Sequence, residues 1–375
     1  MSARRRVVVT GMGSVSAAGA GGTDAVAAAL ERRAPTIAPL KAFMPVGSSS
    51  QLAAEVDDDV LMHLLDAADV RRLSRICRMA VAACGLAVAD ARLESGVRLG
   101  LAVGSEYGDF RSGAEFFNGF LRRGLTGLSP MIFPNTVMNS MAAVAAIAVR
   151  AKAPSVTLNQ ATVAGDLAVA RGAALVADGR ADAVIAGGVD EIFVDVYRGL
   201  AALGALSPMR GGGPEGCRPY APDHNGLVLG EGATFVVLED LRTAQARGAT
   251  IHAEVLGSVW GSIPVAPHTA PAGSLDASRT VRRALEQAGA GPGSLGSCYG
   301  SGNGDPALDD WEIALLAADG IRGPESLAPL FGQHGGLGAL RIAAGALSTK
   351  TGGVSLVHGI ARGGCRTAVV LGQAA

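Results

Sequence analysis

Short apolar runs alternate with longer stretches of helical periodicity along the whole chain. The short runs are rich in Val, Ile and Leu and end at glycine, aspartate or proline, which is typical of buried strands. Such alternation predicts an α/β fold with packed, mostly parallel sheets that helices cover. The predicted strands are Val7–Thr10, Leu99–Gly104, Val156–Leu158, Ala183–Ala186, Thr234–Leu238, Ile251–Gly257, Leu295–Tyr299, Val354–His358 and Thr367–Leu371.

The same alternation occurs twice, on either side of a polar segment at Arg242–Ala249. We therefore expect two halves, residues 1–245 and 250–375. The predicted helices are Thr23–Arg32, Val70–Asp90, Ser140–Arg150, Gly165–Asp178, Ser278–Ala288, Asp309–Ala318 and Gly338–Leu347.

Composition narrows the class of protein. Hydrophobic residues make up 49% of the 375 residues and charged residues 17%, which excludes a disordered chain. The formal net charge of −1 gives no reason to expect a nucleic-acid partner.

Membrane and secretory locations are also not expected. The uncharged segment 124–149 contains Pro130, Pro134 and Asn135, which a lipid-facing helix would carry at high cost. Arg4–Arg6 leads into Val7–Thr10 and a glycine, which predicts a first strand and not a signal peptide. We expect a cytoplasmic protein with no membrane partner.

The sequence predicts neither a metal site nor a bound cofactor. The five cysteines are scattered and none forms a CxxC pair. Gly11 and Gly13 follow the first strand, but Ser16 breaks the spacing of a dinucleotide-binding motif, and no phosphate-binding P-loop motif occurs.

Four segments together carry a family resemblance. In chain order they are Arg6–Gly13, Phe133–Asn139, Ala186–Asp190 and Arg218–Gly226, the last followed by Gly230–Ala233. They are similar to motifs of the β-ketoacyl-acyl-carrier-protein synthases, or ketosynthases. The resemblance implies the thiolase fold, with duplicated βαβαβ halves in a five-layer αβαβα sandwich.

That family's chemistry needs a Cys at a strand-to-helix turn, where the helix start lowers the thiol pKa and helps to bind the oxyanion. Counting back from Gly165 places Thr162 at this position, and no Cys lies between Cys84 and Cys217. A Thr hydroxyl would need an adjacent general base to act as nucleophile. Alternatively, Thr162 caps the helix.

The family also uses two histidines to promote decarboxylation. The first histidine loop is similar to Tyr299–Asn303, so Tyr299 replaces His, and the loop is about two residues longer before Asp309. The second matches His334 on a Gly-rich turn, where a structural role is the alternative. A degenerate closing loop, residues 359–365, ends at Cys365, which is either a residual reactive thiol or a small buried residue.

No catalytic set is intact, and Thr162, Tyr299 and His334 are interpreted as vestigial positions. A ketosynthase scaffold without its Cys resembles the chain length factors, which are non-condensing subunits of type II polyketide synthases. The resemblance implies a heterodimer with a Cys-containing ketosynthase, in polyketide or fatty-acid-like biosynthesis. It also implies a carrier protein bearing a phosphopantetheine-linked acyl chain. We expect the chain to be inactive by itself and part of an acyltransferase complex.

Five of the nine Phe residues fall between positions 110 and 133. Such a cluster is either a small separate core or an apolar wall of an interface or ligand tunnel. The candidates for the tunnel or interface are Phe110, Phe116, Phe117, Phe120, Phe133 and Met138.

Two other functions remain open. One is an independent acyltransferase, hydrolase or β-ketoacyl-acyl-carrier-protein synthase-like enzyme with a rearranged site built on Thr162, His334 or Cys365. The other is a homodimer that binds acyl chains or carrier protein without catalysis. A run of arginines at helical spacing suits an acidic carrier protein or is a solvated face; it comprises Arg71, Arg72, Arg75 and Arg78.

Overall fold

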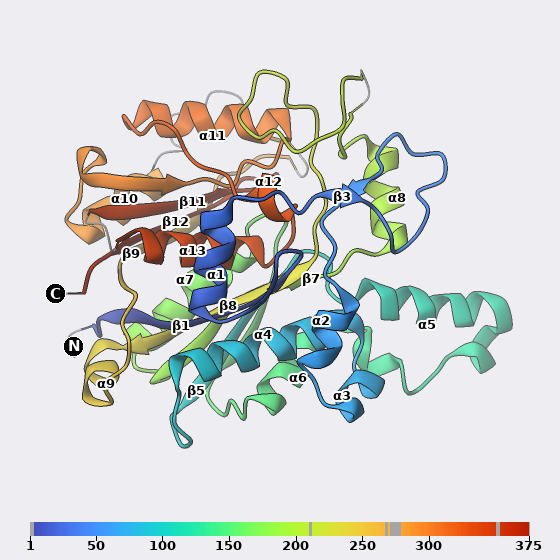
Figure 1. The fold of residues 1–375 in the computed structure, drawn as a ribbon, viewed down its shortest axis with the longest axis horizontal. Helices are drawn as coiled ribbons and strands as arrows, with labels where there is room; N and C mark the ends of the chain where they lie inside the picture. The colour runs from blue at the N-terminus through green and yellow to red at the C-terminus, as the bar shows by residue number, and fades with distance from the viewer. Residues whose placement is uncertain (1–3, 210–211, 267–268, 271–278, 350–352, 375) are drawn as a thin grey trace.

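The computed structural model describes residues 4–209, 212–266, 269–270, 279–349 and 353–374 (Figure 1). Within these residues, ten strands form one sheet in the order β10-β11-β12-β9-β1-β8-β7-β5-β6, with β2 beside β1. A second, two-stranded sheet pairs β3 (Ala38–Pro39) with β4 (Leu52–Ala53). The strands of the large sheet are β1 (Val7–Ser16), β2 (Gly19–Gly21), β5 (Leu99–Ser105), β6 (Ser155–Asn159), β7 (Ala183–Asp190), β8 (Gly232–Asp240), β9 (Ala253–Ser262), β10 (Leu295–Tyr299), β11 (Val354–Ile360) and β12 (Cys365–Gly372).

The large sheet has two halves that meet at β1 and β9. There Val8 pairs with Glu254 and Val9 with Ala253. The first half contains β1, β2 and β5 to β8, and the second contains β9 to β12. The expected boundary between residues 1–245 and 250–375 falls in the link between β8 and β9 and stays a prediction.

The prediction of mostly parallel sheets is wrong. β5 is parallel to β6 and β7, and β10 to β11, but the pairs of β1 with β8 and β9, of β7 with β8, and of β12 with β9 and β11 are antiparallel. A short link such as the one between β11 and β12 forces the next strand to reverse. Apolar runs mark a buried strand but carry no information on its direction.

Helices form three layers around the two halves of the sheet (Figure 1). The two middle helices, α7 (Ala164–Ala177) and α13 (Leu337–Ser348), share one core with β8 and β12. Helices α4 (Arg75–Ala91) and α6 (Ser140–Ala148) cover the outer face of the first half, and α10 (Arg279–Ala288) and α11 (Pro306–Ala318) that of the second. The order of the layers of helices and strands is therefore the expected αβαβα sandwich.

The remaining helices are α1 (Thr23–Arg32), α2 (Asp58–His63), α3 (Ala67–Arg72), α5 (Phe110–Arg123), α8 (Val194–Leu203), α9 (Leu241–Ala246) and α12 (Ala328–Phe331), with the 3₁₀ turns η1 (Gly124–Gly127), η2 (Phe133–Asn135) and η4 (Pro292–Ser294).

The start of α7 crosses the start of α13 at very close range. A Cβ atom on Gly165 would lie 2.4 Å from the carbonyl oxygen of Gly335, and one on Gly338 would lie 2.3 Å from Oδ2 of Asp166. Any larger residue would force the two helices apart. These glycines therefore bring two helix starts to one point between the sheets.

The glycines after the first predicted strand are not a turn. β1 continues through Gly11 and Gly13 to Ser16, with an irregularity in its pairing to β8 between Val9 and Gly11. A Cβ on Gly11 would lie 2.6 Å from Cβ of Ala91 in α4. These glycines allow α4 to pack closely on β1. In the sequence, a glycine with this packing role looks the same as a glycine in a turn.

The predicted helix Val70–Asp90 is also wrong as a single element. It breaks into α3 and α4 because Leu73 and Ser74 are extended, with Ser74 in the N-cap position. The run of arginines is therefore divided between α3, which contains Arg71 and Arg72, and α4, which contains Arg75 and Arg78. Arg75 is bound to Glu231 at 2.5 Å and also to Asp58, so it is not a free docking residue. The predicted helix Ser278–Ala288 begins at Arg279, and Ser278 lies outside the described residues.

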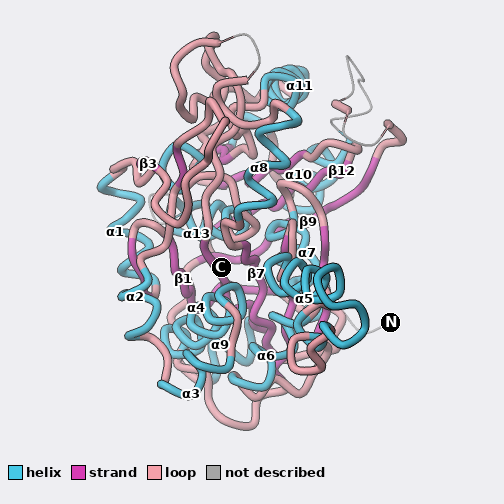
Figure 2. Tube along the Cα trace, turned by 90° about the vertical axis from the view of Figure 1, so that its right-hand side faces the viewer, coloured by secondary structure: helices cyan, strands magenta, loops and turns pink. Residues whose placement is uncertain are grey.

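One segment projects from the body of the protein. We call residues 110–138, which contain α5, η1 and η2, the arm; α5 extends at the right of Figure 1 and faces the viewer in Figure 2. The arm borders β6, the last strand of the large sheet. Among the residues that the structure describes, no helix combines the length and apolar character needed to cross a bilayer.

Candidate functional site

Thr162 lies on a sharp turn between β6 and α7. Its φ of +63° places a β-branched residue in the left-handed region, which is a strained and uncommon backbone conformation. The side chain is buried, with 7% of the residue exposed. The N–H of Thr162 donates a hydrogen bond to Oε2 of Glu106 over 3.1 Å. The predicted strand-to-helix turn is thus present, and a carboxylate of the chain itself accepts from its N–H.

Glu106 comes directly after β5 and is held on both carboxylate oxygens. While Oε2 accepts from Thr162, Oε1 accepts from the hydroxyl of Tyr107 over 2.9 Å. Burial, together with the nearby charge of Asp190, raises the pKa of Glu106 to about 7. At neutral pH this carboxyl group is therefore near the midpoint of its titration.

Asp190 connects the strand ends around this turn. It is 1% exposed at the end of β7 and accepts from the hydroxyl of Ser105 at 2.6 Å and from the N–H groups of Glu106, Tyr107 and Gly335. The Gly335 contact is 2.7 Å and ties the turn before α13 to the loop after β5. Burial raises the pKa of Asp190, although these donors oppose the shift. One carboxylate therefore fixes the loop that carries Glu106.

His334 is next to this connection and is almost fully buried, with 1% exposed. Its Nδ1 accepts from the N–H of Gly336 at 3.1 Å, so the proton of the neutral ring is on Nε2. Within the described residues, Nε2 has no hydrogen-bond partner. Burial and the charge of Arg341 lower the pKa of His334 to about 3. The ring is a neutral donor at pH 7 and a weak base.

An ion pair fastens α7 to α13 behind the turn. Nη2 of Arg341 and Oδ2 of Asp166 are 2.7 Å apart, and both side chains are 1% exposed. A buried pair of this kind tolerates little movement of either helix. The backbone that carries Thr162 and His334 is therefore held rigidly.

The side chain of Tyr299 forms its hydrogen bond at the opposite end of α13 from His334. The Tyr299 hydroxyl is 2.8 Å from Oγ of Ser348 at the end of α13. Two residues later, Ser301 donates its N–H to Glu312 and accepts from the N–H of Ile360. The assignment of Tyr299 to the position of the first histidine stays a prediction.

Glu312 is the centre of a second buried polar cluster. Its carboxylate contacts Nδ1 of His358 at 2.6 Å and accepts from the hydroxyl of Tyr220 at 2.6 Å. Burial alone would raise the pKa of Glu312, but the hydrogen bond and charge of His358, with Tyr220 and Ser301, lower it. These contacts pack the closing loop against β10 and α11, which is a structural role.

The closing loop covers the turn from the other side. Cys365 and Ala361 pack with Val163, the residue after Thr162. Burial raises the pKa of the Cys365 thiol above its ordinary value, so the thiol is protonated at neutral pH. Cys365 is close to the turn, and its environment does not activate it.

The predicted Phe residues all lie on the arm, on different faces of it. Phe110, Phe117 and Met138 line a cavity of about 550 Å³, together with Tyr107, which binds Glu106. Phe116 packs on Phe133, with ring centroids 5.7 Å apart, and lines a separate cavity of about 790 Å³. Phe120 contacts Phe117, at 6.2 Å between centroids. The cavity of about 550 Å³ is therefore lined by the residue that follows Glu106 in the sequence.

Comparison with known proteins decides the family. Residues 4–244 match the model of the β-ketoacyl synthase N-terminal domain. The 3-oxoacyl-[acyl-carrier-protein] synthase 2 of Coxiella burnetii is 30% identical over 84% of this chain and 77% of its own length. The synthase 2 of Synechocystis sp. is also 30% identical, over 84% of this chain and 76% of its own. The chain belongs to the β-ketoacyl synthase family.

Solved structures confirm the thiolase-like ketosynthase fold. The structure described as the ishigamide ketosynthase/chain length factor has a TM-score of 0.89, with 27% identity and full coverage of both chains. A β-ketoacyl synthase from Burkholderia phymatum has a TM-score of 0.82, with 24% identity over 99% of this chain and all of that chain. This ketosynthase-family chain therefore has the expected fold, with a Thr at the turn where the resemblance places a Cys.

Sequence reasoning did not find Glu106 in this ketosynthase-family protein. The predicted strand ended at Gly104, and an isolated Glu beyond a strand has no motif spacing. Its partner Thr162 is 56 residues away in sequence. The one available signal was position, since polar residues at the ends of parallel strands gather at one sheet edge.

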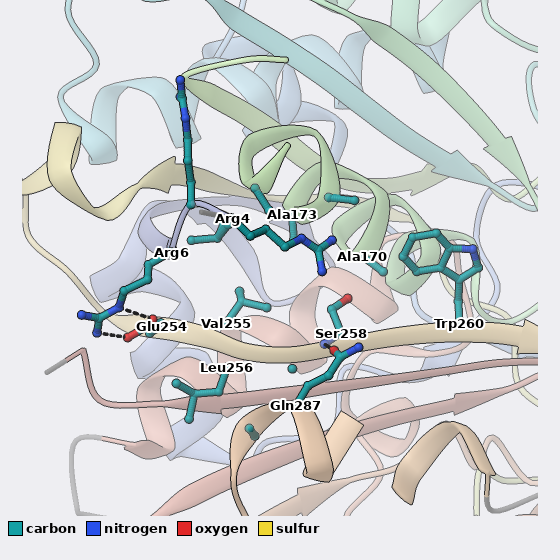
Figure 3. Close-up of a pocket in the computed structure, with 16 residues that line it drawn as sticks. Arg4, Arg6, Ala170, Ala173, Glu254, Val255, Leu256, Ser258, Trp260 and Gln287 are labelled. Carbon is teal, nitrogen blue, oxygen red and sulfur yellow. Dashed lines mark hydrogen bonds and ion pairs between the residues drawn. The ribbon is translucent and has the colours of Figure 1, made fainter. Parts of the chain in front are cut away.

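A cavity of about 460 Å³ lies away from the turn, between the N-terminal residues, β9 and α10 (Figure 3). Its arginines already have partners: Arg6 binds Glu254 at 2.5 Å, and Arg4 is 3.6 Å from Asp178. Gln287 accepts from the N–H of Ser258 over 3.0 Å. The charged groups that the structure describes here are therefore engaged within the chain and are not available for a ligand.

Proposed function

We propose that this chain is a non-condensing ketosynthase-family subunit, a chain length factor, that pairs with a Cys-containing ketosynthase. The partner's Cys would carry out the condensation, and this chain would contribute interface and tunnel wall. The substrate would be an acyl chain on the phosphopantetheine arm of a carrier protein, in polyketide or fatty-acid-like synthesis. The observation that carries the proposal is the turn at Thr162, which keeps its strained backbone without a thiol.

The surrounding groups do not replace the missing chemistry. Activation of the Thr162 hydroxyl needs a base near pKa 7 in hydrogen-bond reach. His334 has a pKa of about 3, and the hydroxyl of Tyr299 is bound to Ser348. Glu106 has a suitable pKa of about 7, but the structure shows it on the N–H of Thr162. A role in assembly fits these contacts better than independent turnover.

The exposed apolar surface of the arm supports a protein partner. Leu125 is 78% exposed, Met131 85% and Phe133 57%. Several large apolar side chains exposed on one short segment are uncommon in a folded protein and favour a contact site there. The neighbouring strand β6 ends the sheet and leaves one edge for further pairing. A twofold-like pairing of two subunits along the arm and β6 would cover the exposed apolar side chains and the free strand edge.

Under this proposal, the cavity below the arm forms part of the tunnel. Phe117 lines it and is 59% exposed in the isolated chain. Replacing Phe117 with Ala removes a large ring from the wall, so the assembled pair should give longer or more variable products. Product mass spectrometry of the reconstituted pair measures this. Phe116→Ala is the matched comparison on the other cavity, and unchanged products from both variants with a stable complex would contradict the tunnel role.

The deciding experiment is gentle affinity purification of the tagged chain from its own host, with mass spectrometry of the proteins recovered. The proposal expects equimolar recovery of a second ketosynthase that retains its Cys. Recovery as a homodimer alone would overturn it and favour an acyl-binding homodimer. Turnover by the isolated chain that Thr162→Ala abolishes would instead favour an independent acyltransferase.

A further inference from the structure

The carboxylate of Glu106 occupies the hydrogen-bonding position at the start of α7. This helix has 14 residues, and the amides at its start carry partial positive charge that favours an anion. Oε2 of Glu106 accepts from the N–H of Thr162 at 3.1 Å. In an acyl-transfer site, an amide on a nucleophile turn is a donor for the oxygen of the reacting carbonyl. Here the chain's own side chain accepts from that donor.

The backbone around Glu106 leaves its carboxylate little freedom to move away. Asp190 binds the N–H groups of Glu106 and Tyr107, and Asp190 is itself anchored by Ser105 and Gly335. The second carboxylate oxygen is engaged by the Tyr107 hydroxyl at 2.9 Å. The contact is therefore built by three strand ends and the turn before α13.

We infer that Glu106 is a built-in occupant of the acyl-carbonyl position, so that this site is closed to thioesters by two separate changes. One change is the absence of a thiol at residue 162, and the other is the carboxylate at residue 106. The inference goes beyond the proposed function because it concerns this chain alone and requires no partner.

A chemical consequence distinguishes the two changes. A thiol introduced at position 162 alone would have a carboxylate against the backbone N–H of its own residue. A neighbouring negative charge disfavours the thiolate, and the reacting carbonyl would lack its hydrogen-bond donor. Removal of the carboxylate as well should restore both conditions. Restoration of the thiol is therefore expected to be insufficient by itself.

The test uses the full-length chain in four variants: T162C, T162C with E106A, T162C with E106Q, and T162C with E115A. Glu115 is a carboxylate on α5 and provides the matched control. The probe is iodoacetamide at pH 7, from which the thiolate forms a C–S bond as iodide leaves. Peptide mass spectrometry follows alkylation at position 162, which separates it from the five native cysteines.

We expect the T162C/E106A protein to react about 10-fold to 100-fold faster than T162C, as a thiol pKa lower by one to two units implies. T162C/E115A should react like T162C. In T162C/E106Q, the Gln side chain keeps the shape of Glu and an acceptor oxygen but carries no charge, so alkylation should also be faster than in T162C. This variant provides a second test in case the Ala variant does not fold. Circular dichroism and thermal unfolding verify that each variant is folded.

A second probe tests the carbonyl position directly. With a hexanoyl thioester of N-acetylcysteamine, the thiolate introduced by T162C would attack the carbonyl, and the N-acetylcysteamine thiolate would leave and take up a proton. Stable acylation is expected in T162C/E106A and not in T162C. Equal alkylation and acylation of T162C and of the folded double variants would overturn the inference. Neither result depends on whether a ketosynthase partner is recovered, so failure here is distinct from failure of the proposed function.

Discussion

The turn at Thr162 and the arm differ in almost every physical respect, although adjacent strands lead to both. β6 leads to Thr162, and β5 leads through Glu106 to the arm. Around the turn the carboxylates of Glu106, Asp166 and Asp190 are buried and bound within the chain, and Asp190 alone accepts hydrogen bonds from four residues. On the arm, Leu125 and Met131 are largely exposed and apolar.

The difference indicates where this chain still has interactions to make. Buried charges need a partner charge or hydrogen-bond donors, and at the turn the chain supplies these for Asp166 and Asp190. Exposed apolar area is stabilised when another surface covers it. A chain that binds its own buried carboxylates at the turn and exposes apolar side chains on the arm fits the proposed role in assembly.

Loss of the ion pair behind the turn should cost the most stability. Asp166→Ala leaves the charge of Arg341 buried without its partner, both side chains being 1% exposed. We expect the free energy of unfolding in urea at pH 7 to fall by about 3 to 5 kcal/mol. Asp178→Ala, at the other end of α7, is the matched control, because its side chain is 54% exposed and should change stability by about 0.5 kcal/mol or less. Equal losses would show that the turn is not held by this pair.

New charges on the arm should prevent assembly without affecting the fold. Leu125→Asp with Met131→Asp places two carboxylates on residues that are 78% and 85% exposed. We expect recovery of the partner in affinity purification to imply an affinity about 100-fold weaker, as for loss of a central interface contact. Ile313→Asp, on an exposed position of α11, should leave recovery unchanged. Normal recovery with the double variant would move the interface elsewhere.

Replacement of Glu106 should stabilise the protein in a pH-dependent way. Its pKa is raised to about 7 in the folded state, so the folded protein holds its proton more tightly than the unfolded chain. Stability contributed by this group is therefore lost as the pH rises from about 4.5 to 7. Glu106→Gln should raise the free energy of unfolding by about 2 kcal/mol at pH 9 and change it little at pH 4.

Urea unfolding at the two pH values measures this difference, with Glu115→Gln on α5 as the control. If Glu106→Gln changed the free energy of unfolding equally at pH 4 and pH 9, burial would not raise the pKa of this carboxyl group.

Sequence patterns predicted the positions of strands and helices better than their directions or side-chain contacts. Thr162 was placed on the correct strand-to-helix turn by counting from Gly165, because helix starts have local sequence features. The strained φ and the contact with Glu106 were not predictable, since they depend on the packing of residues far apart in the chain. Likewise, Gly11 was expected to follow the first strand and lies within it, because the close approach of α4 leaves no local trace in the sequence.

For His334, the sequence predicted the position of the residue but not its environment. Its place on the Gly-rich turn was found from the motif, but its burial and the loss of basicity follow from surroundings contributed by α13. For Tyr299, the motif indicated a position after a strand, and that residue ends β10. The hydrogen bond of its hydroxyl to Ser348 depends on a residue 49 positions away and left no signal in the sequence.

The narrow junction of the large sheet has a mechanical consequence. Two residue pairs, Val8 with Glu254 and Val9 with Ala253, join its halves through β1 and β9. A junction so short resists twisting weakly, so the angle between the halves depends mainly on the core that α7 and α13 share with β8 and β12. The close crossing at Gly165 and Gly338 lies within this core. A larger residue at either glycine would therefore be expected to change the angle between the two halves as well as the local packing.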